Sequence, residues 1–246
     1  MNDLIATIKK SMFVPIHPAG WPFIGIAAVI FLFFAYIGTK LGFVGLVLLC
    51  WCIYFFRCPL RVTPTRPGLV VSPADGMVQM IVETTLPPEL DDCKGQGDAL
   101  CDAATVTRVS VFLNVFDVHV NRIPAEGEIK KVVYRPGKFF NASLDKASVD
   151  NERSTVLMKL KDHPSSVAFV QIAGLVARRI ICQLTAGQSV KAGDIYGLIR
   201  FGSRVDIFLP PGVHPLVCVG QRMIGGETII ADLTSNEAAR SGEVRK

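Results

Sequence analysis

Three short segments carry side chains whose types suit nucleophilic chemistry. Asp75 lies in VSPADG, His119 in FLNVFDVHVNRIP and Ser203 in YGLIRFGSRVD. A carboxylate can orient an imidazole, and the imidazole can then take the proton of a serine hydroxyl. Each residue also has a structural interpretation, as a turn cap, a buried histidine and a small residue at a bulge. Spacing alone does not unite residues so far apart in the chain.

The Gly202-Ser203 pair is unusual because the residues on both sides of it are typical of a β-strand. Glycine weakens a strand interior, since it has no side chain to pack and loses more entropy on ordering than other residues. The pair therefore indicates a position where another group approaches the backbone closely.

From residue 57 to residue 234 the pattern predicts a mainly β domain. Short runs of Val, Ile and Phe alternate with turns that contain Gly, Pro and Asp. Glycine turns set against short strands resemble those of the lipoyl- and biotin-carrier sandwich, so we expect a β-sandwich or barrel-sandwich-like fold. A carrier function is disfavoured, because Lys130 does not follow the methionine that usually precedes a biotinylated lysine. The expected strands are 69–72, 77–83, 106–115, 127–134, 155–160, 167–172, 178–184, 195–201, 205–209 and 216–220.

Other parts of this domain are less regular. Residues 86–104 are polar and contain Gly and Pro, which predicts a surface loop, and 141–150 are expected to hold a short helix. Phe139-Phe140 have two interpretations, core packing, which we favour, and an apolar tip that touches lipid. The charged tail 235–246 has few apolar residues and is expected to be disordered.

Residues 21–56 form an apolar block with one charge, Lys40. A membrane span needs roughly 20 apolar residues, and Gly38-Thr39-Lys40 divides the block into the halves 21–37 and 41–56. We expect a membrane-inserted helical hairpin, in preference to one long tilted span or a re-entrant loop. Residues 1–20 are then a juxtamembrane segment.

The charge pattern favours a membrane surface over nucleic acid as the partner. The net charge is only +5, and no basic stripe is interleaved with aromatic residues. Basic residues flank the apolar block, with Lys9 and Lys10 before it and Arg57, Arg61 and Arg66 after it. By the positive-inside rule these flanks lie in the cytoplasm. The chain is therefore expected in the cell membrane, with its β domain on the cytoplasmic side.

Seven cysteines occur without regular spacing. No CxxC motif is present, so we expect no zinc site. Cys93 and Cys101 are the one loosely paired couple that suits a metal or a disulfide. The favoured interpretation is that the cysteines are reduced thiols in a domain that faces the cytosol.

A combination of motifs identifies a family. FFRCP, VSPADG, NVFDVHVNRIPAEGEI, YRPGKFFNASLDKASVDNER, QIAGLVARRIICQL and GLIRFGSRVDIFLP together span most of residues 55–234. The chain resembles the phosphatidylserine decarboxylase proenzymes in their shorter bacterial and archaeal form. The resemblance implies self-cleavage between Gly202 and Ser203, which turns Ser203 into a covalent pyruvoyl cofactor. It also implies that chains 1–202 and 203–246 stay together as a heterodimer and convert phosphatidylserine in the bilayer to phosphatidylethanolamine and carbon dioxide.

The resemblance makes His119 and Asp75 the candidates for the base and the orienting carboxylate of self-processing. Longer bacterial members of the family carry two histidines in D-x-H-x-x-H, whereas here the second position is Arg122. A guanidinium is a poor base because its pKa is about 12.5 or higher. Either His119 serves both processing and decarboxylation, or Asp75 acts more directly. Arg122 is a candidate for binding the lipid phosphate, with a plain surface charge as the alternative.

Two other functions stay open on the residues alone. A membrane-anchored serine hydrolase would use Asp75, His119 and Ser203, although no GxSxG elbow surrounds the serine. A β-sandwich binding module of enzymatic ancestry would use none of them.

Overall fold

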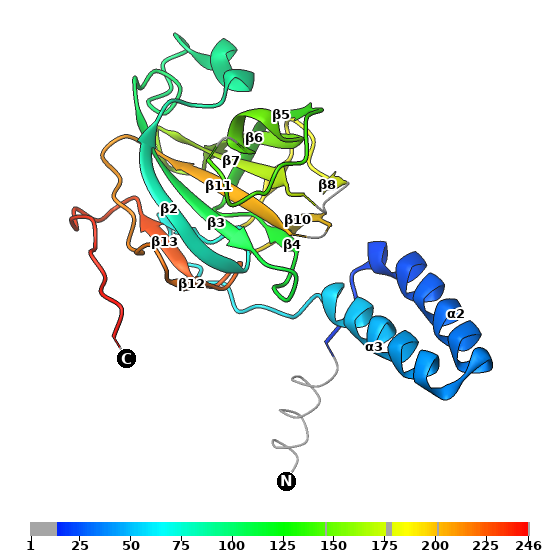
Figure 1. The fold of residues 1–246 in the computed structure, drawn as a ribbon. Coiled ribbons are helices and arrows are strands. Elements are labelled where there is room, and N and C mark those ends of the chain that lie inside the picture. Colours follow the sequence, from blue (N-terminus) through cyan, green and yellow to red (C-terminus); the bar gives the residue numbers. More distant parts are fainter. Residues whose placement is uncertain (1–13, 146, 176–178, 201, 246) are drawn as a thin grey trace. The chain divides into compact units, whose positions relative to one another are not determined.

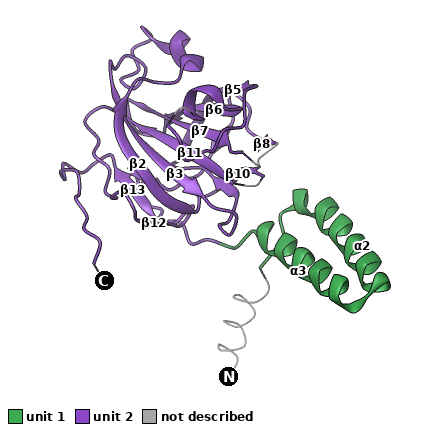
Figure 2. Cartoon of the chain, in the orientation of Figure 1, with its two compact units in different colours: residues 1–60 green, residues 61–246 purple. Residues whose placement is uncertain are grey.

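The computed structural model describes residues 14–145, 147–175, 179–200 and 202–245 (Figure 1). The chain divides into two compact units, residues 1–60 and residues 61–246 (Figure 2). The basic residues Lys9 and Lys10, and most of the expected juxtamembrane segment 1–20, lie outside the described residues.

The first unit contains two antiparallel helices, α2 (Trp21–Ile37) and α3 (Thr39–Phe55), preceded by the short 3-10 helix η1 (Pro18–Gly20). Gly38 alone separates α2 from α3. The helices approach closely at glycines, since a Cβ added at Gly45 would lie 2.8 Å from the Cα of Phe31. The apolar block is thus a helical hairpin packed through small residues, as is common between membrane helices.

One stretch of the hairpin is long and apolar enough to cross a membrane. Helical residues Pro18–Ile37 number 20 and have a hydropathy of 2.1, whereas α3 has 17 residues and extends about 25 Å. Large apolar side chains such as Leu32, Phe33 and Phe43 are exposed on these helices. The exposed apolar surface weakly suggests a membrane, and insertion as a two-span hairpin stays a prediction.

The second unit is built from antiparallel strands, which confirms the mainly β prediction. A curved eight-stranded sheet faces one sheet of three strands and one of two (Figure 1). In spatial order the large sheet contains β12 (Arg222–Met223), β2 (Gly76–Thr84), β3 (Val106–Leu113), β11 (Ser203–Leu209), β7 (Ser166–Ala173), β6 (Arg153–Leu160), β5 (Gly127–Arg135) and β9 (Ser189–Val190). The smaller sheets contain β4 (Val120–Arg122), β10 (Ile195–Ile199) and β8 (Ile180–Cys182), and β1 (Leu69–Val71) and β13 (Ile229–Asp232).

The main core joins the large sheet to the two smaller ones. It includes Ile207 of β11, Ile199 of β10 and Ile230 of β13, all fully buried. Side chains alternate between the two faces of a strand, and Phe208 of β11 accordingly belongs to a second apolar cluster. Both faces of β11 are therefore covered, and all seven of its residues are buried, including the polar Ser203, Arg204 and Asp206.

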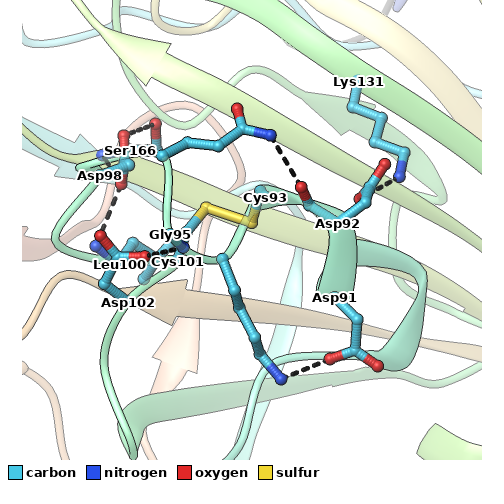
Figure 3. Close-up of a disulfide and its surroundings, with 12 residues drawn as sticks. Asp91, Asp92, Cys93, Gly95, Asp98, Leu100, Cys101, Asp102, Lys131 and Ser166 are labelled. Carbon is cyan, nitrogen blue, oxygen red and sulfur yellow. Dashed lines mark hydrogen bonds and ion pairs between the residues drawn. A yellow bond between two sulfur atoms is a disulfide. The ribbon is translucent and has the colours of Figure 1, made fainter.

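The segment 86–104 covers the second cluster and is more ordered than a plain surface loop. It contains the 3-10 helix η2 (Pro88–Cys93), and its Leu90 and Leu100 are fully buried. Cys93 and Cys101 form a disulfide within it (Figure 3). The expectation of reduced thiols is therefore wrong for this pair, because the segment folds back and brings the two sulfur atoms together. The other five cysteines form no disulfide among the described residues.

Buried ion pairs attach this segment to the large sheet. The Glu89 carboxylate accepts hydrogen bonds from Arg153 at 2.6 Å and from Arg135 at 3.1 Å, and the Arg153 side chain is 1% exposed. Asp98 accepts from the Ser166 hydroxyl at 2.7 Å (Figure 3). Burial opposes ionisation of Glu89, but the hydrogen bonds from the arginines outweigh it and lower the pKa of that carboxyl.

Of three further expectations, one differs from the structure and two agree with it. Residues 216–220 are not a strand, because Gly220 takes a positive φ of 89° and the segment turns back toward β2. The short helix expected within 141–150 is present as α4 (Ala147–Asp150), and turns precede it among the described residues. Phe139 packs against the main core, in agreement with the favoured interpretation.

The described part of the tail, 235–245, has no helix or strand. Its Arg240 donates a hydrogen bond to the carbonyl of Leu216 at 3.0 Å. Whether this segment is disordered in solution stays a prediction.

The Glu89 ion pair predicts a specific dependence of stability on pH. Glu89→Gln leaves the buried Arg153 charge unpaired and is expected to lower the free energy of unfolding by about 3 kcal/mol at pH 7. Since the pKa of Glu89 is lower in the folded state, its stabilising effect is present above about pH 4.3 and is lost as the pH falls through the folded pKa. Denaturant unfolding from pH 7 to pH 3 measures this difference.

The matched control is Glu128→Gln, which removes a half-exposed pair with Lys130 and should change stability by less than about 1 kcal/mol. Equal effects of the two substitutions at pH 7 would contradict the structural role given to Glu89.

Candidate active site

Gly202 and Ser203 lie where the chain passes from one sheet to another. The preceding strand, β10, belongs to the three-stranded sheet, and β11 begins at Ser203 in the centre of the large sheet. Gly202 takes a positive φ of 65°, a conformation that glycine adopts without the steric cost that a Cβ brings. The glycine inside an apparent strand is thus explained, because the apparent strand is two strands joined by a sharp turn.

The Ser203 side chain is completely buried at the first position of β11. Its backbone pairs with Leu113 of β3 on one side and with Ala173 of β7 on the other. By alternation it shares a face with Val205 and therefore points to the main core side. Its hydroxyl has no hydrogen-bond partner among the described residues. A buried polar group without a partner is costly, which indicates a functional reason for its presence.

His119, the residue immediately before β4, contacts this turn directly. Its ring is fully buried, and its Nε2 lies 3.1 Å from the backbone nitrogen of Gly202. Its Nδ1 lies 3.0 Å from the carbonyl oxygen of Asp117. A carbonyl only accepts and an amide only donates, so Nδ1 must carry the proton and Nε2 must accept. The two contacts therefore select one neutral tautomer, with the basic nitrogen directed at the scissile residue.

The loop that supplies the Asp117 carbonyl is itself fixed. One Asp117 carboxylate oxygen accepts a hydrogen bond from the Asn114 backbone at 2.9 Å, and the other is paired with Arg222. Asp117 is 1% exposed, so this pairing satisfies a buried charge. The motif that contains His119 thus also contains the group that orients it.

Gly174 lies against the carbonyl oxygen of Gly202. A Cβ added at position 174 would come within 2.2 Å of that oxygen. This close approach requires glycine at 174 and confines the carbonyl that precedes Ser203. Sequence reasoning missed Gly174, because a contact between two backbones leaves no side-chain pattern.

Asp75 lies in the predicted turn after β1. Its carboxylate accepts from Arg61 at 2.6 Å and from the backbone nitrogen of Gly225 at 2.8 Å. The same turn supplies the carbonyl of Pro73, which accepts from the backbone nitrogen of Arg122 at 2.9 Å. Asp75 therefore fixes a turn that is hydrogen-bonded to β4, the strand that follows His119.

The half-buried Arg122 donates from Nη1 to the carbonyl oxygen of Gly193 at 2.8 Å. Its Cδ would lie 2.8 Å from a Cβ added at Gly226. The structure thus brings His119 to Gly202 and Ser203, and it brings Asp75 and Arg122 to the adjacent segment Gly225-Gly226.

Comparison with known proteins agrees with these features. The sequence profile of the phosphatidylserine decarboxylase family matches residues 48–231. A phosphatidylserine decarboxylase proenzyme from Paramagnetospirillum magneticum is 56% identical over 239 residues, which cover 97% of this chain and 95% of the relative. Proenzymes with the same name from Cereibacter sphaeroides and Rickettsia felis are each 52% identical, over 99% and 96% of this chain and 99% and 98% of their own lengths.

The match extends over nearly the whole chain and includes every segment that forms the site around Gly202. The chain therefore belongs to the phosphatidylserine decarboxylase family and is a decarboxylase.

Proposed function

We propose that the protein decarboxylates phosphatidylserine to phosphatidylethanolamine after cutting itself between Gly202 and Ser203. The observation that carries the proposal is the contact between the basic nitrogen of His119 and Gly202, beside a buried serine hydroxyl without a described partner. The names of the relatives support the substrate, and the word proenzyme in those names supports the cleavage.

The cleavage begins with the Ser203 hydroxyl. Its oxygen attacks the carbonyl carbon of Gly202 and gives up its proton, and the peptide C–N bond breaks as the nitrogen of residue 203 is protonated. An ester then links Gly202 to the side chain of residue 203. His119 is the base that the described contacts bring to this turn, and Gly174 confines the attacked carbonyl.

The ester is removed by elimination. The α-proton of residue 203 is abstracted, the Cβ–O bond breaks, and Gly202 leaves as a carboxylate. The remaining dehydroalanine tautomerises to an imine, which water hydrolyses to a ketone with release of ammonia. The products are chain 1–202 and chain 203–246, the second of which begins with a pyruvoyl group.

The surroundings of residue 203 fit such a group. The new chain end stays attached, because β11 is hydrogen-bonded to β3 and β7 along its length. Arg204, which is fully buried, donates to the carbonyls of Ala142 and Leu144 at 3.1 Å each and pairs with Asp206. These contacts support a stable heterodimer of the two chains.

The pyruvoyl ketone supplies an electron-withdrawing carbonyl that stabilises the electron pair left when carbon dioxide departs. Because its Nδ1 proton is donated to the Asp117 carbonyl, His119 presents Nε2 to the site, and this nitrogen is suited to take up a proton and return it to the carbon. Asp75 is a positioning residue in this proposal, because its described bonds fix the turn beside β4.

The proposed location is the cell membrane, with the β domain on the cytoplasmic side. The exposed apolar helices and the basic residues Arg57, Arg61 and Arg66 support it. The Cys93–Cys101 disulfide is more typical of an oxidising compartment and is the observation that speaks against it.

A serine hydrolase is a weaker second candidate. Ser203 is completely buried within a central strand, whereas a hydrolytic serine must meet an external substrate. An internal peptide bond is already adjacent to the hydroxyl, so burial favours self-cleavage.

Intact mass separates these functions. The mature protein is expected to give two fragments, with the smaller one starting in pyruvoyl at 203, and Ser203→Ala is expected to stay a single inactive chain. The control is Ser241→Ala in the exposed tail, which should be cleaved normally. Cleavage of Ser203→Ala at the same bond would contradict the proposed nucleophile.

Gly174→Ala tests the confinement of the scissile carbonyl. Its Cβ would lie 2.2 Å from the Gly202 oxygen, so the turn must shift and cleavage is expected to slow by about 100-fold or more. The rate is followed by gel or mass analysis of freshly translated protein. The control is Gly25→Ala, whose Cβ meets no atom within 4 Å. Wild-type cleavage in Gly174→Ala would show that this contact is irrelevant to the reaction.

A further inference from the structure

Two arginines lie opposite each other at the end of the strand that leads into the scissile turn. Strand β10 pairs with β8 in a register that sets Ile199 against Ile180. The next position continues the ladder, since the Arg200 backbone nitrogen donates to the Arg179 carbonyl at 3.3 Å. Residues directly opposite in an antiparallel ladder project to the same face, with Cβ atoms roughly 5 Å apart.

Two positive charges in this arrangement are unfavourable without an anion between them. Arg179 is exposed and makes no ion pair with a carboxylate among the described residues. Burial and the Arg179 charge together lower the pKa of Arg200, which agrees with two guanidinium groups close together.

The pair adjoins the reacting residues. Arg200 precedes Gly202 by two positions, and the backbone nitrogen of its neighbour Ile199 donates to the His119 carbonyl at 3.3 Å. We propose that Arg179 and Arg200 bind the phosphodiester of the phospholipid head group during decarboxylation. This inference rests on the proposed function and adds to it the site that holds the substrate.

The phosphodiester suits this pair better than the carboxylate of the same head group. Guanidinium groups bind phosphate oxygens through two parallel hydrogen bonds. The phosphodiester keeps its charge throughout the reaction, so binding it does not oppose the chemistry. The carboxylate must lose its charge as carbon dioxide, and two arginines on it would stabilise the substrate more than the transition state.

Assigning the phosphodiester to Arg179 and Arg200 differs from the sequence-based expectation, in which Arg122 was the candidate for binding the lipid phosphate. The Arg122 guanidinium donates to the Gly193 carbonyl and its stem lies against Gly226. These contacts support a role for Arg122 in holding two segments of the fold together beside the site.

The test compares Arg179→Gln and Arg200→Gln with wild type, after intact mass has measured the extent of self-cleavage. The substrate is dihexanoyl phosphatidylserine below its micelle concentration. Either substitution is expected to raise KM about tenfold or more, with a much smaller change in kcat, because each removes a charge-assisted hydrogen bond to the phosphodiester. Arg179→Lys keeps the charge and should recover part of the loss.

A binding measurement complements the kinetics. Glycerophosphocholine carries the phosphodiester but has no primary amine to condense with a ketone, so it reports on phosphodiester binding alone. Its affinity should fall in both Gln variants and stay unchanged in Arg245→Gln, a control in the exposed tail. Inorganic phosphate, titrated in parallel, shows whether a free phosphate is held as well as the diester.

Three outcomes would overturn the inference. One is an unchanged KM and an unchanged affinity for glycerophosphocholine in both Gln variants. Another is a higher KM only with phosphatidylserine in vesicles, which would make the pair a membrane contact. The third is binding of inorganic phosphate alone. If the Arg200→Gln protein does not cleave itself, the Arg179→Gln variant, which changes an exposed side chain, still tests the inference. If wild type itself stays uncleaved, the proposed function fails, and the glycerophosphocholine titration still decides the anion site.

Discussion

The hydrogen bond between the Gly202 amide and Nε2 of His119 is the constraint on which the site depends. It uses the acceptor nitrogen of the ring, while the Asp117 carbonyl takes the proton on the other nitrogen. Backbone groups therefore determine which ring nitrogen carries the proton and which accepts. The base is held against Gly202, whose φ is positive. A buried imidazole held in this way needs no carboxylate to select its tautomer.

The turn has this geometry because the chain changes sheets there. β10 ends in the small sheet that contains β4, and β11 begins between β3 and β7 in the large one. The bond after Gly202 thus joins two elements that are each held independently by their neighbours. Cutting it releases the turn without releasing either strand, and Arg204 holds the new chain end through its buried contacts.

The sequence was sufficient to predict the long strands and the residues at the cleavage site. The strands over 106–113 and 205–209 carry Val, Ile, Phe or Leu at most positions and are mostly buried, and the motifs around His119 and Ser203 are specific. The short strands β4, β9, β12 and β13 were not predicted, because two to four residues that pair with distant segments carry little local pattern. The disulfide was missed in favour of reduced thiols, since spacing does not show how segment 86–104 folds back.

The contact of the Asp117 carbonyl with Nδ1 of His119 was also beyond the sequence, because a backbone group leaves no side-chain pattern. Nitrogen NMR of His119 in the uncleaved Ser203→Ala protein tests the account most directly. The account predicts a neutral ring near pH 7.5, protonated at Nδ1, with an unprotonated Nε2 that accepts the Gly202 amide. A ring protonated at Nε2 in that protein would contradict it, since such a nitrogen is unable to take a proton at the scissile turn.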